Sequence, residues 1–210
     1  MKFYDCATAP SPRRVRIFAA EKGITLPTVQ VDLRNREQFT PAFRAINPDC
    51  TVPALALDDG TIIADAVAIC GYLEELQPDP PLIGATPQER AVVTALNRQI
   101  ERDGFFAAMD AFRNTARGLV GRALPGPHDY AQIPELAARG RARLENFFKA
   151  MNVRLADREF VAGGRYTIAD ISTMVLTDMA VRMVKLAIPD DCPHMRRWYD
   201  AVAARPSAMA

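Results

Sequence analysis

The sequence predicts two domains, an α/β domain at the N-terminus and an all-helical domain at the C-terminus. Three observations lead to this division of the 210 residues. Short apolar runs alternate with helical patterns up to residue 77. Residues 78–86 read PDPPLIGAT, and their prolines prevent a helix and predict an extended linker. The later pattern is helical, so we expect domains at residues 1–77 and 87–210.

The first 32 residues predict a strand, a helix and a second strand. Residues 2–5 (KFYD) predict a short strand, and the proline-punctuated residues 7–12 predict a loop. Apolar residues at helical spacing follow over residues 15–22, where Gly23 provides a C-terminal stop. With a strand at residues 28–32, this segment is one βαβ unit.

The sequence pattern in the rest of the first domain predicts a helix, a hairpin and a further helix. A short helix is expected around residues 41–46. Apolar runs at residues 54–57 and 61–63 flank an Asp-Asp-Gly turn that closes a hairpin, and Pro53 begins its first strand. A helix is expected from Asp65 to about Leu76. The order βαβα-Pro-ββα is that of a thioredoxin-like domain.

The sequence pattern of the second domain predicts a bundle of helices. Long helical patterns cover residues 87–117, 134–157 and 194–204. The first of these is weakened at Gly104. A further helix begins after Thr167, whose hydroxyl can cap the first turn while Asp170 reaches back to the Thr167 N–H. We expect this capping box to serve the fold rather than a site.

Composition and charge exclude several classes of partner. The net charge is +1, with both signs interspersed, so neither nucleic acid nor an anionic membrane surface is expected as a partner. No apolar run is long enough to span a bilayer, and the N-terminus has no signal-peptide pattern. The four cysteines are widely spaced and there are only two histidines, which suggests neither a metal site nor disulfides. We expect a cytoplasmic location.

Five motifs in order and spacing resemble those of soluble glutathione S-transferases of the bacterial type. They read RRVRIFAAEKGI (13–24), VDL (31–33), NPDCTVPAL (47–55), DGTIIADAVAICGYLEE (59–75) and FVAGGRYTIADIS (160–172). The resemblance covers essentially the whole chain. It implies a homodimer and a detoxification reaction in which the thiolate of the co-substrate glutathione attacks a small hydrophobic electrophile.

The resemblance also indicates where the thiol is activated. Ala9 stands where serine- and cysteine-dependent members carry their reactive residue, and alanine cannot donate a hydrogen bond. Ser11 matches an asparagine that serves a group of bacterial members, so we expect Ser11 to be the catalytic residue. Because Pro12 is a favoured first helical residue, Ser11 is expected at or near the N-cap. Two alternatives stay open: Ser11 only caps the helix, or Thr8 is the donor.

The remaining glutathione contacts follow from the same motifs. Val52 and Pro53, across a cis peptide bond, are expected to pair with the cysteinyl backbone. Asp65 is expected to bind the γ-glutamyl ammonium, while the free N–H groups of its helix bind the α-carboxylate. Ala66 lacks the hydroxyl that the family usually has there, which predicts binding weaker by roughly 1 kcal/mol. Gln38 matches a side chain that contacts the glycyl end.

The electrophile pocket is expected between the domains, on the first long helix after the linker. Its candidate residues are Phe105, Phe106, Met109, Phe112 and Arg113. Aromatic residues and methionine at helical spacing also fit a helical core, and that alternative stays open.

Two other functions stay open. The first is a non-catalytic scaffold or binding protein of the same fold, which the loss of hydroxyls at Ala9 and Ala66 favours. The second is a glutathione-dependent reduction of a peroxide or disulfide at the same site.

Overall fold

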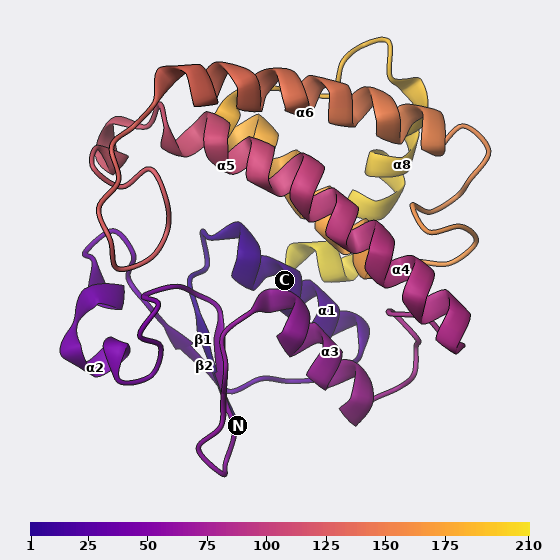
Figure 1. Cartoon of the computed structure of the whole chain (residues 1–210). Helices are drawn as coiled ribbons and strands as arrows, with labels where there is room; N and C mark the ends of the chain where they lie inside the picture. Colours follow the sequence, from indigo (N-terminus) through magenta and orange to yellow (C-terminus); the bar gives the residue numbers. More distant parts are fainter. The chain divides into compact units, whose positions relative to one another are not determined.

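The computed structural model describes residues 1–210 and divides into two compact units. The first unit contains Met1–Pro80, together with Leu124–His128 and Met209–Ala210. The second contains Pro81–Ala123 and Asp129–Ala208. The first unit holds a small mixed sheet with helices and the second is helical (Figure 1). The predicted fold class of both parts is confirmed.

The first unit has the predicted order of elements. They are β1 (Lys2–Asp5), α1 (Pro10–Glu21), β2 (Thr28–Gln30), η1 (Glu37–Phe39), α2 (Pro41–Arg44), β3 (Ala54–Ala56), β4 (Ile62–Ile63) and α3 (Ala66–Leu76). The strands form one sheet in the order β2-β1-β3-β4. The pair β1 and β2 is parallel, whereas β3 runs antiparallel to both β1 and β4. The two central strands are β1, which belongs to the βαβ unit, and β3, which belongs to the hairpin.

Helices α1 and α3 pack against each other beside the sheet (Figure 1). Their apolar faces supply core residues such as Ile17, Phe18, Ile69 and Leu73, all fully buried. The prediction that the first helix follows a loop ending at Pro12 is wrong, because α1 already begins at Pro10. Proline suits the first turn of a helix, where an N–H has no partner in any case.

A buried ion pair joins the end of α1 to α3. The ammonium of Lys22 is fully buried and lies 2.5 Å from a carboxylate oxygen of Glu74. It also donates hydrogen bonds to the carbonyls of Pro78 and Pro80, at the start of the predicted linker. Three acceptors thus satisfy one buried cation, which is the condition for keeping a charge away from water.

The second unit is built from helices. They are α4 (Pro87–Ile100), the π-helical turn η2 (Glu101–Phe105), α5 (Phe106–Arg113), η3 (Arg117–Leu119), α6 (Pro134–Arg154), α7 (Ile168–Met179), the π-helical turn η4 (Ala180–Val184), α8 (Pro193–Ala203) and η5 (Pro206–Met209). The continuous helix predicted over residues 87–117 is wrong in two respects. It contains the π turn and ends at Arg113. None of the helices is long and apolar enough to cross a membrane.

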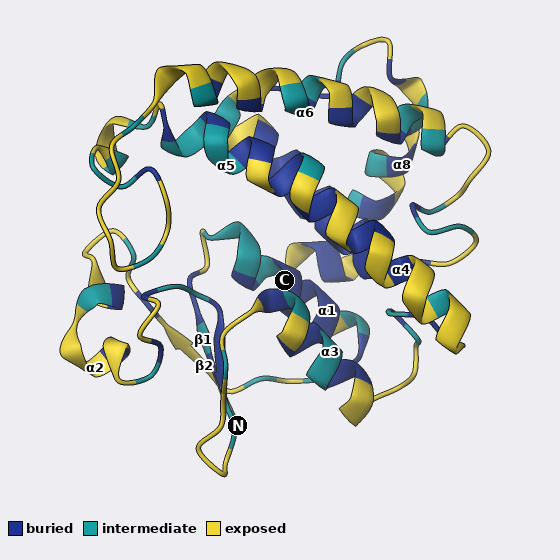
Figure 2. Ribbon diagram, in the orientation of Figure 1, coloured by how far each residue is buried: buried dark blue, intermediate teal, exposed yellow.

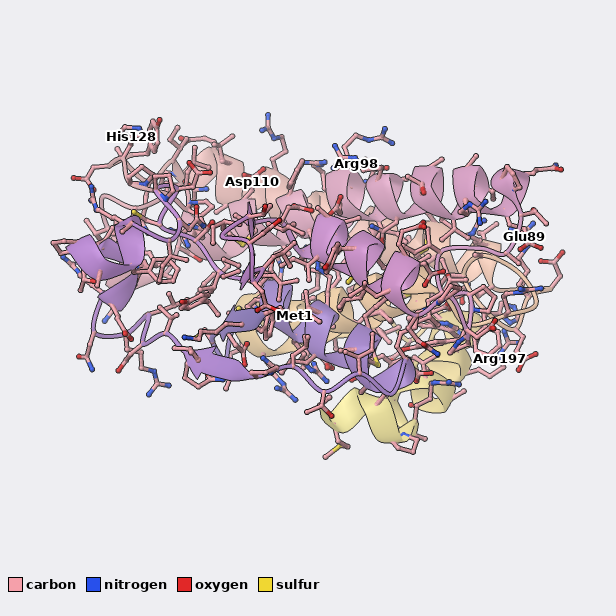
Figure 3. The ribbon with its side chains drawn as sticks, turned by 90° about the horizontal axis from the view of Figure 1, so that it is seen from below. Met1, Glu89, Arg98, Asp110, His128 and Arg197 are labelled. Carbon is pink, nitrogen blue, oxygen red and sulfur yellow. The ribbon has the colours of Figure 1, made fainter.

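The charges of α4 follow its dipole. Glu89 lies in the first turn, where its carboxylate accepts the Ala85 N–H at 2.8 Å, and Arg98 lies in the last turn (Figure 3). Negative charge near a helix N-terminus and positive charge near the C-terminus both stabilise a helix. Buried and exposed stripes alternate along α4 and α6, as expected for helices with one side in a core (Figure 2).

Helix α7 is the centre of the second unit, since all twelve of its residues are buried. The predicted capping box is confirmed: Thr167 accepts from the first turn and Asp170 accepts the Thr167 N–H at 2.9 Å. Asp170 also accepts the Val161 N–H at 2.8 Å and the Trp198 indole N–H at 2.9 Å. Burial raises the pKa of Asp170 to about 6, although these hydrogen bonds act in the opposite direction. One carboxylate therefore ties together α7, α8 and the loop before α7.

Two glycines mark the closest helix packing. A Cβ atom on Gly104 would lie 2.2 Å from Leu176 Cδ2, so this glycine lets α7 approach the π turn. A Cβ atom on Gly140 of α6 would lie 2.5 Å from the Ala107 carbonyl oxygen and 2.7 Å from the Ala111 nitrogen of the facing helix α5. Neither backbone atom can move away as a flexible side chain would.

We predict that Gly140→Ala lowers the free energy of unfolding by about 1–3 kcal/mol, because the added methyl group forces α5 and α6 apart. The matched control is Gly71→Ala in α3, where a Cβ atom would meet nothing within 4 Å. That substitution should raise stability by about 0.5–1 kcal/mol through helix propensity alone. Chemical denaturation of both variants measures the difference, and equal effects would contradict the packing account.

Candidate active site

Strand register brings four loops of the first unit to one end of the sheet. Asp5 at the end of β1 pairs with Gln30 at the end of β2. Tyr4 lies opposite Ala54, so the end of β1 lies beside the start of β3, and β4 returns to the same end. We call this region the site end of the sheet. The segments that leave or enter it hold the six residues predicted to bind glutathione: Ser11, Gln38, Val52, Pro53, Asp65 and Ala66.

Ser11 is the second residue of α1 and is half-buried. It carries the one backbone N–H among the first three helical residues, because Pro10 and Pro12 have none. Neither this N–H nor the Ser11 hydroxyl has a hydrogen-bond partner in the chain. The N-cap is Ala9, with no side-chain cap. Ser11 lies two residues after the N-cap, within the prediction that it is at or near this position. It offers two unused donors at the positive end of a helix.

Thr8, the alternative donor, lies in the exposed loop before α1. Its hydroxyl is 3.5 Å from the sulfur of Cys6. All four cysteines are free and buried, and Cys6 is only 7% exposed. The hydroxyl of Thr8 therefore has a neighbour within the loop, whereas that of Ser11 has none.

Val52 presents an unpaired backbone at the site end. The Val52–Pro53 peptide bond is cis, and β3 begins directly afterwards at Ala54. The N–H and C=O groups of Val52 have no partner in the chain, and the residue is half-buried. Backbone groups in such a position normally pair with another chain, a ligand or water.

Asn47, which was not predicted as a site residue, holds the loop before Val52. Its side chain is 2% exposed and donates to the Thr51 carbonyl at 2.9 Å, while its oxygen accepts the Asp49 N–H at 3.1 Å. Cys50 in this loop has a left-handed backbone, with φ of 55°. The Asn-Pro pair predicts a turn from the sequence, but only the structure shows that the Asn47 side chain bonds to the loop backbone at Asp49 and Thr51.

Asp65 is the N-cap of α3 rather than its first helical residue, which is Ala66. One carboxylate oxygen accepts the N–H groups of Val67 and Ala68 at 2.9 and 2.8 Å. The second oxygen is without a partner, and the residue is exposed. The predicted set of free N–H groups in this turn therefore reduces to that of Ala66, whose side chain is 3% exposed.

Gln38 lies in η1, in the segment that follows β2. Its side chain is 5% exposed, and its Oε1 atom is buried without a hydrogen-bond partner. A buried amide oxygen in this state carries a desolvation cost that a ligand donor can remove.

The five residues predicted for the electrophile pocket fall into different environments. Phe105 is 6% exposed in the π turn, whereas Phe106 is 56% exposed. Met109 and Phe112 on α5 are half-buried. Arg113 donates to the carbonyls of Arg122 and Ala123 at 2.7 and 3.3 Å, and burial lowers its pKa. The core alternative thus fits Phe105, and the guanidinium of Arg113 braces a loop.

One segment of the middle of the chain groups with the first unit. Leu124–His128 clusters with Met1–Pro80, and a Cβ atom on Gly126 would lie 3.7 Å from the Asp49 carbonyl oxygen. His128 therefore brings an imidazole to the unit that carries the site end (Figure 3). The domain bounds predicted from the sequence place this Gly- and Pro-rich segment in the helical domain, residues 87–210. The local sequence holds no sign that the segment packs with the first unit. No group of three or more His, Cys, Asp or Glu side chains is placed to hold a metal ion.

Comparison with known proteins gives a consistent result. The family models described as glutathione S-transferase, N-terminal domain, and glutathione S-transferase, C-terminal domain, match residues 8–76 and 126–206. Glutathione S-transferase 2 of Saccharomyces cerevisiae is 34% identical over 210 residues, which cover 99% of this chain and 87% of that protein. Maleylacetoacetate isomerase of Pseudomonas aeruginosa is 29% identical over 217 residues, covering 99% and 93%.

Among solved structures, a glutathione S-transferase domain-containing protein of Marinobacter aquaeolei superposes with a TM-score of 0.90. It is 40% identical, and the match covers 99% of both chains. The two domain models and a relative 34% identical over nearly the whole chain show the same family. The chain belongs to the glutathione S-transferase family.

Proposed function

We propose that the protein is a glutathione S-transferase in which Ser11 activates the glutathione thiol for attack on a hydrophobic electrophile. The observation that carries this proposal is the pair of unused donors of Ser11, at the same sheet end as the unpaired backbone of Val52. A protein that kept the fold only as a scaffold has no need of either. The family match supports the choice of glutathione as co-substrate.

The tripeptide binds through its main chain and its two ends. Its cysteinyl N–H and C=O pair with those of Val52, as an added strand would. Its γ-glutamyl ammonium contacts the open carboxylate oxygen of Asp65, and its α-carboxylate accepts the Ala66 N–H. The glycyl N–H donates to the buried Oε1 of Gln38. Pro53 fixes the direction of the chain beyond Val52.

This placement brings the thiol to the first turn of α1. Lowering a thiol pKa from about 8.5 by about two units requires roughly 3 kcal/mol of preferential stabilisation of the thiolate. A hydroxyl donor, a backbone N–H and the positive end of a helix supply contributions of that order. The thiol proton leaves to solvent, the thiolate forms a carbon–sulfur bond, and the bond from that carbon to its leaving group breaks.

The co-substrate is a small hydrophobic electrophile, for which the exposed Phe106 and the half-buried Met109 and Phe112 are candidate contacts. The four buried, free cysteines fit a reducing, cytoplasmic location and a role in detoxification. The assembly is a homodimer, as in the family.

A second candidate activity is isomerisation at the same thiolate. The relative named maleylacetoacetate isomerase, 29% identical over nearly the whole chain, favours it. Both activities need the same bound thiolate and differ in whether the substrate loses a leaving group. Product analysis by mass spectrometry separates them, because only transfer leaves a stable glutathione adduct.

We predict that Ser11→Ala lowers kcat/KM for a generic aromatic electrophile by about 10- to 100-fold, since a hydrogen bond to a charged partner contributes about 1.5–3 kcal/mol. The free energy of unfolding should change by less than about 0.5 kcal/mol, because the hydroxyl bonds to nothing in the chain. The pH dependence of the rate should move to higher pH. An unchanged rate would contradict the assignment.

Thr8→Ala is the matched control, since it removes a hydroxyl from the loop directly before α1. We expect its kcat/KM to stay within about twofold of the wild type, a free-energy change below 0.5 kcal/mol. If this variant loses activity and Ser11→Ala does not, the donor is Thr8.

We also predict that Asp65→Asn raises the Kd for glutathione by about 10- to 100-fold, because the ammonium loses its charged partner. Asparagine is as good an N-cap as aspartate, so α3 should keep its stability. Isothermal titration measures both proteins with glutathione and with an analogue that lacks the γ-glutamyl amino group. The variant should bind the analogue as the wild type does, and an unchanged Kd for glutathione would refute the contact.

A further inference from the structure

A closed ring of hydrogen bonds surrounds Ala7, in the loop that leads to Ser11. The Ala7 N–H donates to Gln30 Oε1 at 2.9 Å, and Gln30 Nε2 donates to Asp5 Oδ2 at 2.6 Å. Asp5 Oδ1 accepts from Arg16 Nη1 at 2.5 Å, and Arg16 Nη2 donates to the Ala7 carbonyl at 3.1 Å. Three side chains from β1, β2 and α1 thus hold both polar groups of one exposed alanine.

The ring replaces a constraint that α1 lacks. Most helices fix the direction of the entering chain with an N-cap side chain, but Ala9 has none to offer. The Ala9 N–H donates to the Cys6 carbonyl at 2.9 Å, which closes the turn but does not orient it against the sheet. The bonds to Ala7 do so, because Asp5 and Gln30 are paired residues at the ends of two neighbouring strands.

The ring contributes little to the apolar core. Gln30 and Ala7 are exposed, and the Arg16 side chain is 20% exposed. Asp5 is 1% exposed, so its carboxylate needs the two donors that it has. The arrangement therefore orders a surface loop at the site end of the sheet. Ala7, which the ring holds, lies four residues before Ser11, so the ring can affect the position of the Ser11 donors.

We propose that Gln30, Arg16 and Asp5 are positioning residues for thiol activation, which set the place of the Ser11 donors through the backbone of Ala7. This inference rests on the proposed function. It assigns a role to residues that lie outside the glutathione contacts themselves. A displacement of about 1 Å in a reacting geometry can cost about 100-fold in rate, so a loop that is loosely held would be a poor support for Ser11.

The sharpest variant is Gln30→Met. It keeps the length and the aliphatic stem of the side chain, removes both hydrogen bonds and leaves Asp5 paired with Arg16. It alters no charge, so a changed thiol pKa reports the position of the donors. Thr28→Ala is the control on the same strand, since the Thr28 hydroxyl bonds only to the Leu26 carbonyl.

A second variant, Arg16→Lys, keeps the charge opposite Asp5. A lysine ammonium lacks the planar fork with which arginine reaches two acceptors at fixed geometry. The bond to the Ala7 carbonyl should therefore be lost while the ion pair remains. Gln30 and Arg16 bond to opposite sides of the same residue, Ala7. If both variants change the thiol pKa in the same direction, the cause is the position of the loop and not a property of one side chain.

The measurement is the pH titration of the thiolate of bound glutathione, followed by its ultraviolet absorbance, together with kcat/KM and the Kd for glutathione. In Gln30→Met and Arg16→Lys we expect the midpoint to rise by about one unit and kcat/KM at neutral pH to fall about tenfold. The Kd for glutathione, measured at a pH well below both midpoints so that the bound thiol is protonated, should stay within about twofold of the wild type. Thr28→Ala should match the wild type.

Two results would overturn the inference, and they are distinguishable. If the wild type shows a lowered midpoint and both ring variants keep it, the ring has no part in thiol activation while the proposed function stands. If the wild type binds no glutathione or leaves the thiol midpoint near its free value, the proposed function fails and the inference fails with it. A drop in thermal stability alone, with an unchanged midpoint, counts against positioning.

Discussion

The antiparallel pairing of β1 with β3 is the constraint on which the site depends. With Tyr4 opposite Ala54, the chain leaves β1 and enters β3 at the same end of the sheet. The loop that leads to Ser11 and the loop that carries Val52 therefore lie at the same end of the sheet, although some forty residues separate Ser11 from Val52. A one-residue change of register would turn the side chains of β3 to the other face of the sheet.

The polar residues of the two units do three different kinds of work. In the first unit Lys22 pairs with Glu74, and in the second unit Asp170 accepts hydrogen bonds from Val161 and Trp198. Asn47 and the ring on Ala7 fix loops whose own backbone bonds are few. Ser11 and Val52 are left with unused donors and acceptors. The contrast is informative, because buried polar groups are normally paired and unpaired ones at a common location indicate a ligand.

Much of the fold follows from local patterns in the sequence. The βαβ unit, the Asp-Asp-Gly hairpin and the Thr167 capping box are confirmed because each is encoded within a few residues. The start of α1 is predicted too late, since Ala9 gives no N-cap signal and Pro10 can serve as well as Pro12. The π turn at Glu101–Phe105 is not predicted, and Gly104 in this turn packs closely against Leu176, which lies far along the chain.

The site divides in the same way. Residues named by motif, such as Asp65 and Val52, lie at the site end of the sheet. The ring of Asp5, Arg16 and Gln30 could not be predicted, because three separate elements supply it and none has a distinctive neighbour in sequence. For the same reason, helical spacing alone did not separate the buried Phe105 from the exposed Phe106.

The central claim is that the donors of Ser11 meet the sulfur of glutathione, and a crystal structure of the complex tests it most directly. The account predicts the sulfur within about 3.5 Å of the Ser11 hydroxyl or N–H, with the cysteinyl backbone paired to Val52. A tripeptide bound at Val52 with its sulfur turned away from Ser11, toward another donor, would contradict it.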